Sequence, residues 1–144
     1  MSWPTPHPGL VIRYAYLWER EAKEGREEGV KDRPCAIVLV VLNRGKAPLV
    51  RVLPVTSSAP SDPADALEIP PATKKRLGLD ADRSWVVLTE ANDFVWPGPD
   101  LRPAISGDPS SVVYGVLPPG FMAALRQKLA QRWTEKRAAV ARTE

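Results

Sequence analysis

Charged and hydroxyl side chains gather at three places where a predicted strand begins or ends. The first is Lys31-Asp32-Arg33-Pro34, which leads into the most apolar stretch of the chain. The guanidinium of Arg33 can bind two oxygens of a phosphodiester at once, although a surface ion pair with Asp32 or Glu28 is the commoner role of such an arginine. Arg33 is therefore a candidate phosphate-binding residue, with Lys31 as a neighbouring cation.

The other two places offer hydroxyls and carboxylates. Thr56, Ser57 and Ser58 follow the apolar segment 49–55. A threonine in that position can donate a hydrogen bond to a phosphoryl oxygen, or it can cap a turn, which is more common. Glu90 closes the apolar segment 84–90 and Asp93 follows it, so either carboxylate is a candidate proton acceptor.

Other catalytic chemistries lack the residues that they need. The chain has one histidine, His7, in a proline-rich lead-in, and one cysteine, Cys35, inside the most apolar stretch. These counts exclude multi-histidine metal sites and Cys-rich zinc modules. The phosphate-binding motifs G-x-x-x-x-G-K-[ST] and G-x-G-x-x-G are also missing. We expect chemistry that uses no metal and no other cofactor.

The elements that position these residues are predicted to be short. Sixteen prolines in 144 residues favour short strands joined by loops over a helical bundle. Apolar and β-branched runs predict strands at residues 10–16, 34–42, 49–55, 66–69, 84–90 and 111–116. Residues 71–77 predict a short helix. Residues 19–32 are expected to form a long solvated loop, and residues 93–108 an irregular segment.

The end of the chain differs from the rest in charge and periodicity. The net charge is +3, but Phe121–Glu144 contains six Lys or Arg and two Glu, so the preceding part carries −1. A stripe at helical spacing predicts one long basic helix over residues 118–142, with a packing face as the commoner role. The stripe consists of Phe121, Leu125, Leu129, Trp133 and Val140.

These elements predict a mostly β fold with a C-terminal α-helix: a small barrel of antiparallel strands in a single domain, residues 1–144. Residues 8–96 are expected to form the barrel core, and 97–117 an irregular segment plus a strand. No apolar run approaches the roughly 20 residues of a membrane-spanning helix, and the chain does not open on a leader pattern. A cytoplasmic protein without membrane contact is expected.

In this order, the motifs resemble those of the PemK/MazF toxins. The family has a first strand of the form G-x-[IV]-V, similar to Pro8-Gly9-Leu10-Val11 here. It also has R-P at the start of a long central strand, matched by Arg33-Pro34, and V-x-P-[VI]-T-S at the end of the next, matched by residues 52–57. An acid that closes a later strand corresponds to Glu90. The match spans residues 8–96.

The resemblance implies an SH3-like barrel that forms a homodimer, cleaves single-stranded RNA independently of the ribosome and is neutralised by a cognate antitoxin. Arg33 matches the family's phosphate-binding arginine, Thr56 its transition-state threonine and Glu90 its acid. Two features depart from the family pattern. Leu88 stands where some members have an arginine, and residues 19–32 lack the histidine of others.

We expect further residues near these three to bind RNA. Unpaired bases can stack on aromatic side chains, here Trp18, Phe94 and Trp96, for which core or dimer packing is the alternative. The polar candidates are Lys31, Ser57, Ser58 and Asn92.

Two other functions are consistent with the sequence. One is a catalytically inactive barrel that binds nucleic acid or protein, favoured by the two departures. The other gives the basic C-terminal helix, through Trp133, the main role in binding an acidic partner.

Overall fold

A long central hairpin organises the fold. The computed structural model describes residues 3–25, 31–135 and 139–141. Strands β2 (Arg33–Asn43) and β3 (Lys46–Thr56) pair in antiparallel fashion and are joined by a turn at Gly45 (φ +70°). The β-branched run and the turn residues thus form the hairpin that the sequence predicts.

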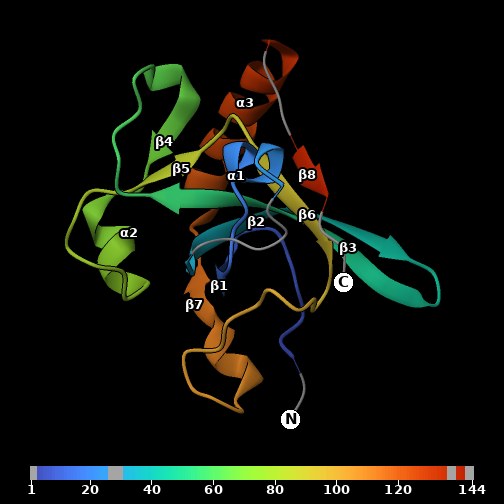
Figure 1. Cartoon of the computed structure of the whole chain (residues 1–144). Coiled ribbons are helices and arrows are strands. Elements are labelled where there is room, and N and C mark those ends of the chain that lie inside the picture. Colours follow the sequence, from blue (N-terminus) through green and yellow to red (C-terminus); the bar gives the residue numbers. More distant parts are fainter. Residues whose placement is uncertain (1–2, 26–30, 136–138, 142–144) are drawn as a thin grey trace.

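The other strands extend this hairpin on both sides (Figure 1). β1 (Leu10–Tyr14) pairs with the start of β2, and β7 (Val113–Val116) pairs with β1. β5 (Trp85–Val87) pairs with the end of β3, and β4 (Ala66–Glu68) with β5. All these pairs are antiparallel.

Apolar side chains cover both faces of the central strands. One cluster contains Ile12, Tyr14, Cys35 and Phe94. The other contains Val11, Ala36 and Leu53. It also contains Leu77, which directly follows α2 (Pro71–Arg76), and Leu125 of α3 (Pro119–Glu135). Alternation along the strands therefore sends successive residues into two different cores. Cys35 is fully buried, as its apolar surroundings predict.

The prediction of a mostly antiparallel sheet with a C-terminal helix is confirmed, but a closed barrel is not. Within the described residues β4 and β7 end the path of strands without pairing with each other. One pair of strands is parallel, namely β6 (Ala91–Val95) with β8 (Ala139–Ala141).

Three predictions about local structure are wrong in part. Residues 19–23 form the short helix α1 (Glu19–Lys23), while 26–30 of the expected loop lie outside the described residues. The expected irregular segment 93–108 begins with the last residues of β6, which pairs with β3. The C-terminal helix ends at Glu135, so Val140 belongs to β8; the remainder of the expected helix, 136–138 and 142, is not described.

Two of these corrections have a physical cause in the contacts of the described residues. α1 begins where the Trp18 amide donates to the Glu21 carboxylate at 3.1 Å, which satisfies an otherwise free N-terminal group. β6 sends Phe94 into the core, where its ring stacks on that of Tyr14 with centroids 4.7 Å apart. Such long-range contacts outweigh local propensity.

Candidate functional site

Arg33 and Thr56 lie at neighbouring ends of β2 and β3. In the antiparallel register Cys35 pairs with Pro54. Two further residues along the same register bring Arg33 to Thr56, and both side chains line one pocket of about 320 Å³. The hairpin therefore brings together two residues that are far apart in the sequence.

Other polar residues line the same pocket. Lys31 and Ser57, two of the expected RNA-binding residues, are among them. Ser58 is exposed and does not line it, but its backbone N–H donates to Thr56 Oγ1 at 3.1 Å. The remaining polar lining residues are Asp32, Asp80, Ser84 and Tyr114.

The Arg33 guanidinium has few partners. Its Nη1 donates to the Val55 carbonyl at 3.5 Å, and its Cζ lies 4.8 Å from the centre of the Trp18 ring. Its buried Nε has no hydrogen-bond partner among the described residues. A half-buried guanidinium with unused donors can bind the oxygens of an anion.

Asp32 does not neutralise Arg33. Its carboxylate pairs with Arg13 Nε at 3.5 Å and with Arg102 Nε at 3.6 Å. The alternative pairing of Arg33 with Glu28 involves a residue outside the described part of the chain. The expected ion pair between the sequence neighbours Asp32 and Arg33 is thus replaced by two pairs to other segments.

The loop after α2 forms the far wall of this pocket. Gly78, Leu79 and Asp80 line it, and Asp80 accepts a hydrogen bond from Lys74 Nζ at 2.8 Å. Only 5% of the Lys74 side chain is exposed, and the Asp82 carbonyl is its second partner. The hydrogen bond from Lys74 lowers the pKa of the Asp80 carboxyl, so Asp80 is ionised at neutral pH.

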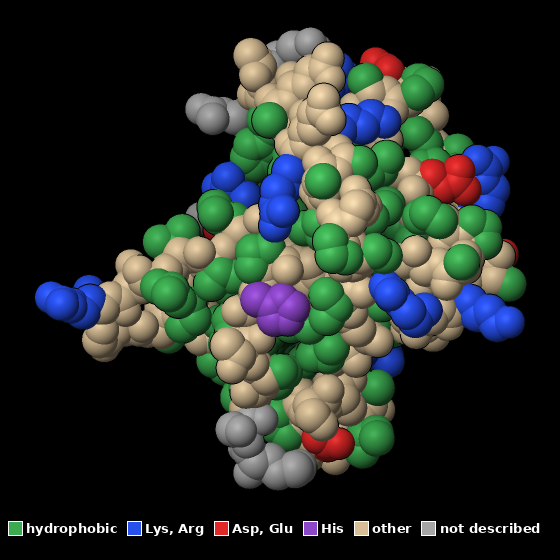
Figure 2. All heavy atoms as spheres, turned by 180° about the vertical axis from the view of Figure 1, so that it is seen from behind, with side chains coloured by type: hydrophobic (Ala, Val, Ile, Leu, Met, Phe, Trp, Pro, Cys, Tyr) green, Lys and Arg blue, Asp and Glu red, His purple; other side chains and the backbone are tan. Residues whose placement is uncertain are grey.

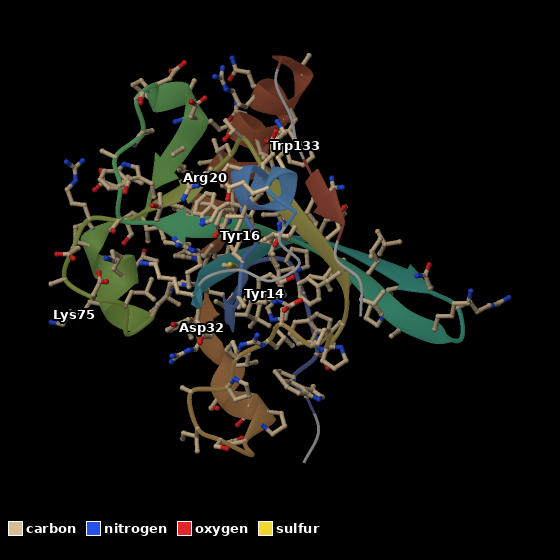
Figure 3. All side chains as sticks on the ribbon, viewed as in Figure 1. Tyr14, Tyr16, Arg20, Asp32, Lys75 and Trp133 are labelled. Carbon is tan, nitrogen blue, oxygen red and sulfur yellow. The ribbon has the colours of Figure 1, made fainter. Side chains whose placement is uncertain are left out.

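A second, smaller hollow of about 210 Å³ adjoins the first. Arg33 and Lys31 line both hollows. Trp18 lines the second hollow together with Arg33 and Tyr16. Its ring meets the Tyr16 ring edge-on, with the ring centroids 5.1 Å apart. Arg20 of α1 also contributes, and Figure 3 shows it close to Tyr16. The half-buried Trp18 thus remains near the site, as expected.

Glu90 lies beyond this second hollow and lines neither of the two. Its Oε1 accepts hydrogen bonds from the Tyr16 hydroxyl at 3.1 Å and from the Glu19 amide at 2.9 Å. Burial raises the pKa of the Glu90 carboxyl, although both hydrogen bonds oppose the shift. Burial, and after it the same carboxylate, raise the pKa of the Tyr16 hydroxyl. Glu90 therefore links the start of α1 to Tyr16, and it is not in the Arg33–Thr56 pocket.

Asp93, the alternative acid, is also elsewhere. Its two oxygens bind Arg51 Nε at 2.6 Å and Nη2 at 2.7 Å across the β3–β6 pair. This bidentate pair occupies the carboxylate, and the hydrogen bond to Asp93 raises the pKa of Arg51.

Three residues expected to bind RNA belong to the core instead. Asn92 is fully buried, and its side-chain amide both donates to and accepts from the backbone of Leu17 at 2.8 Å. Phe94 and Trp96 are 2% and 5% exposed. Buried rings pack against each other and have no face left for a base.

Asp80, Ser84 and Tyr114 also line the pocket, although no motif in the sequence marks them. They reach the pocket from the loop after α2, from the residue before β5 and from β7. Gly78 marks the end of α2 and predicts a turn there, but no local signal places that turn against Arg33.

The described residues contain no group of three or more His, Cys, Asp or Glu side chains that could hold a metal ion. Among the described helices, none has both the length and the apolar character that crossing a bilayer requires.

No protein-family model matches this sequence, and no curated protein is significantly similar to it.

Proposed function

We propose that the chain is a metal-independent endoribonuclease, a divergent relative of the PemK/MazF toxins, which cleaves single-stranded RNA at the Arg33–Thr56 pocket. The observation that carries the proposal is the position of these two side chains on neighbouring strands around one pocket. The open, mostly antiparallel sheet is in this view a variant of the SH3-like barrel of that family. A homodimer and a cognate antitoxin are the proposed partners.

The proposed reaction is a transesterification within the RNA. The 2′-oxygen attacks the adjacent phosphorus, a 2′-O–P bond forms and the P–O5′ bond breaks. The 2′-hydroxyl proton passes to a base, and the departing 5′-oxygen takes up a proton from water. The products are a 2′,3′-cyclic phosphate and a 5′-hydroxyl. DNA lacks the nucleophile, which explains a restriction to RNA.

Arg33 and Thr56 serve the phosphate in this proposal. The guanidinium holds the nonbridging oxygens, supported by Lys31, and the Thr56 hydroxyl donates a hydrogen bond that strengthens as charge develops on phosphorus. The engagement of Asp32 by other arginines, which leaves Arg33 without that counter-charge, favours this assignment.

The proton acceptor is the part of the proposal that the geometry modifies. Glu90, the expected base, lines neither hollow and already accepts two hydrogen bonds. Asp80 lines the pocket with Arg33 and Thr56, and 70% of its side chain is exposed. We therefore move the role of the base from Glu90 to Asp80.

RNA cleavage in excess EDTA is the test. Purified protein is incubated with end-labelled single-stranded RNA, and the products are examined for a cyclic phosphate. We expect cleavage by the wild type, and a loss of about 100- to 1,000-fold in Arg33→Ala. Arg44→Ala, which removes an exposed arginine at the hairpin turn, is the matched control and retains activity.

A nucleic-acid-binding module without catalysis is the second candidate. The observation that favours it is the ion pairing of Asp32 and Asp80, the acids that line the pocket, because an acid held by a cation is a weaker base. RNA binding that depends on Arg33 but gives no products would support this candidate. Cleavage that is equal in wild type and Arg33→Ala would contradict the nuclease proposal.

A further inference from the structure

The second hollow, which adjoins the candidate pocket, combines cations with aromatic rings. Its lining contains three cations, Arg20, Lys31 and Arg33, beside the rings of Tyr16 and Trp18. On the face of the molecule that is seen from behind, by contrast, Lys and Arg side chains are scattered among hydrophobic ones (Figure 2). Positive charge beside aromatic rings is the combination with which proteins bind unpaired nucleotides.

The size and the position of this hollow suit one nucleobase. Its volume of about 210 Å³ lies below the range of about 300–1,000 Å³ that is typical of pockets for drug-sized ligands, so it suits a single ring system. Arg33 lines both hollows, and its Cζ lies 4.8 Å from the centre of the Trp18 ring. A phosphate that binds Arg33 in the first hollow can therefore have its own base in the second.

The second hollow also contains one nearly buried carboxylate, that of Glu21. This residue is 6% exposed and lines the hollow. Its Oε1 accepts a hydrogen bond from the Trp18 amide at 3.1 Å, and its Oε2 has no hydrogen-bond partner among the described residues. A carboxylate has about four acceptor positions, and buried polar groups generally have their hydrogen bonds satisfied. Glu21 thus offers acceptors to a ligand that carries N–H groups.

We propose that the second hollow binds guanine and that Glu21 selects this base. Guanine presents two neighbouring donors, N1–H and the N2 amino group, which the two oxygens of a carboxylate can accept together. Its O6 and N7 are acceptors, and a bidentate arginine contact to these two atoms is the commonest specific contact to a base. Arg20 can supply such donors, because it is exposed and belongs to the lining of the hollow.

The other bases match this set of groups less well. Adenine and cytosine each present an amino group without a ring N–H beside it, and uracil presents a ring N–H without an amino group. Each would leave an acceptor of Glu21 unpaired, and a site built for hydrogen bonds discriminates against a ligand that lacks one of them. The phosphate of the same nucleotide lies at Arg33 in this arrangement, which therefore rests on the proposed function.

Calorimetric titration of the full chain with nucleoside monophosphates tests this preference without any cleavage. The probes are the 3′- and 5′-monophosphates of guanosine, adenosine, cytidine and uridine. We expect a guanosine monophosphate to bind at least about tenfold more tightly than the others, as one good bidentate contact provides. Glu21→Gln should remove most of this preference, because its amide N–H groups would face the donors of guanine.

Glu24→Gln is the matched control. Glu24 is exposed directly after α1 and lines neither hollow, so its variant should keep the preference although it loses the same charge. Circular dichroism verifies that both variants fold.

Several results would overturn the guanine site. They are equal affinity for the four bases, no binding of any monophosphate, a guanine preference that survives Glu21→Gln, and a preference that is lost in Glu24→Gln. The nuclease proposal is judged separately, by RNA cleavage in EDTA. Cleavage together with equal affinity for the four bases would refute the guanine site alone, whereas guanine-selective binding without cleavage would refute the nuclease alone.

Discussion

Arg33 precedes Cys35 by two residues, Thr56 follows Pro54 by two, and the two residues share one pocket at the end of the Cys35–Pro54 register. A hairpin register is a rigid relationship, because a slip by one residue would turn either side chain to the opposite face of the sheet. The two groups are therefore held in place by the backbone of the central hairpin.

The first prediction concerns the Thr56 hydroxyl. Thr56→Val preserves the shape of the side chain and removes the hydroxyl, so we expect RNA cleavage to fall by about 100- to 1,000-fold. The variant also loses the hydrogen bond from the Ser58 amide, which is worth about 0.5–1.5 kcal/mol of folding free energy. Cleavage rates and urea unfolding measure the two effects.

Thr56→Ser is the control for this prediction, since it restores a hydroxyl at the same carbon and should retain most of the activity. A Thr56→Val protein that cleaves RNA at the wild-type rate would remove Thr56 from the mechanism.

The convergence of Arg33 and Thr56 could be predicted because its determinants are local. A β-branched run, a turn at residues 43–46 and a second apolar run specify a hairpin, and a hairpin places the start of one strand beside the end of the other. The antiparallel strands and the apolar face of the C-terminal helix were predictable for the same reason.

The position of Glu90 could not be predicted from local pattern. Its partners, Tyr16 and Glu19, lie 74 and 71 residues away. Glu19 is in a segment whose charges predict a solvated loop, and Tyr16 ends a predicted strand. Similarly, the prolines that follow Phe94 hide the alternation of β6, and Asp80 reaches the pocket through a turn that the sequence does not orient. Each of these features depends on contacts between distant segments.

The second prediction concerns the ion pair that supports the pocket wall. Asp80→Asn leaves the nearly buried Lys74 ammonium without its carboxylate, so we expect a loss of about 1–3 kcal/mol in the free energy of unfolding. Lys74→Met removes the buried charge together with the pair and should cost less. Urea unfolding near neutral pH compares the two variants, and a larger loss in Lys74→Met would contradict this account.

The third prediction separates a packing role of α3 from a partner-binding role. Leu125 is fully buried in the same cluster as Val11 and Leu53, so Leu125→Ala should destabilise the fold by about 2–5 kcal/mol. Gln127→Ala, on the exposed face of the same helix, should change stability by no more than about 0.5 kcal/mol. Thermal or urea unfolding measures both. Equal stability of the two variants would mean that the helix does not close the core.

The last prediction is a pH dependence that originates at Glu90. Burial raises the pKa of its carboxyl in the folded state, so between the unfolded value, about 4.3, and the raised folded value the folded state binds more protons than the unfolded state. The free energy of unfolding therefore falls as pH rises through that window. Glu90→Gln cannot ionise, yet its amide oxygen can still accept from Tyr16 and from the Glu19 amide. Relative to the wild type, this variant should gain stability as the pH rises above the unfolded value of about 4.3, as urea unfolding at several pH values would show. A wild type that gains on the variant over this range would mean that the two hydrogen bonds favour the ionised carboxylate by more than burial disfavours it.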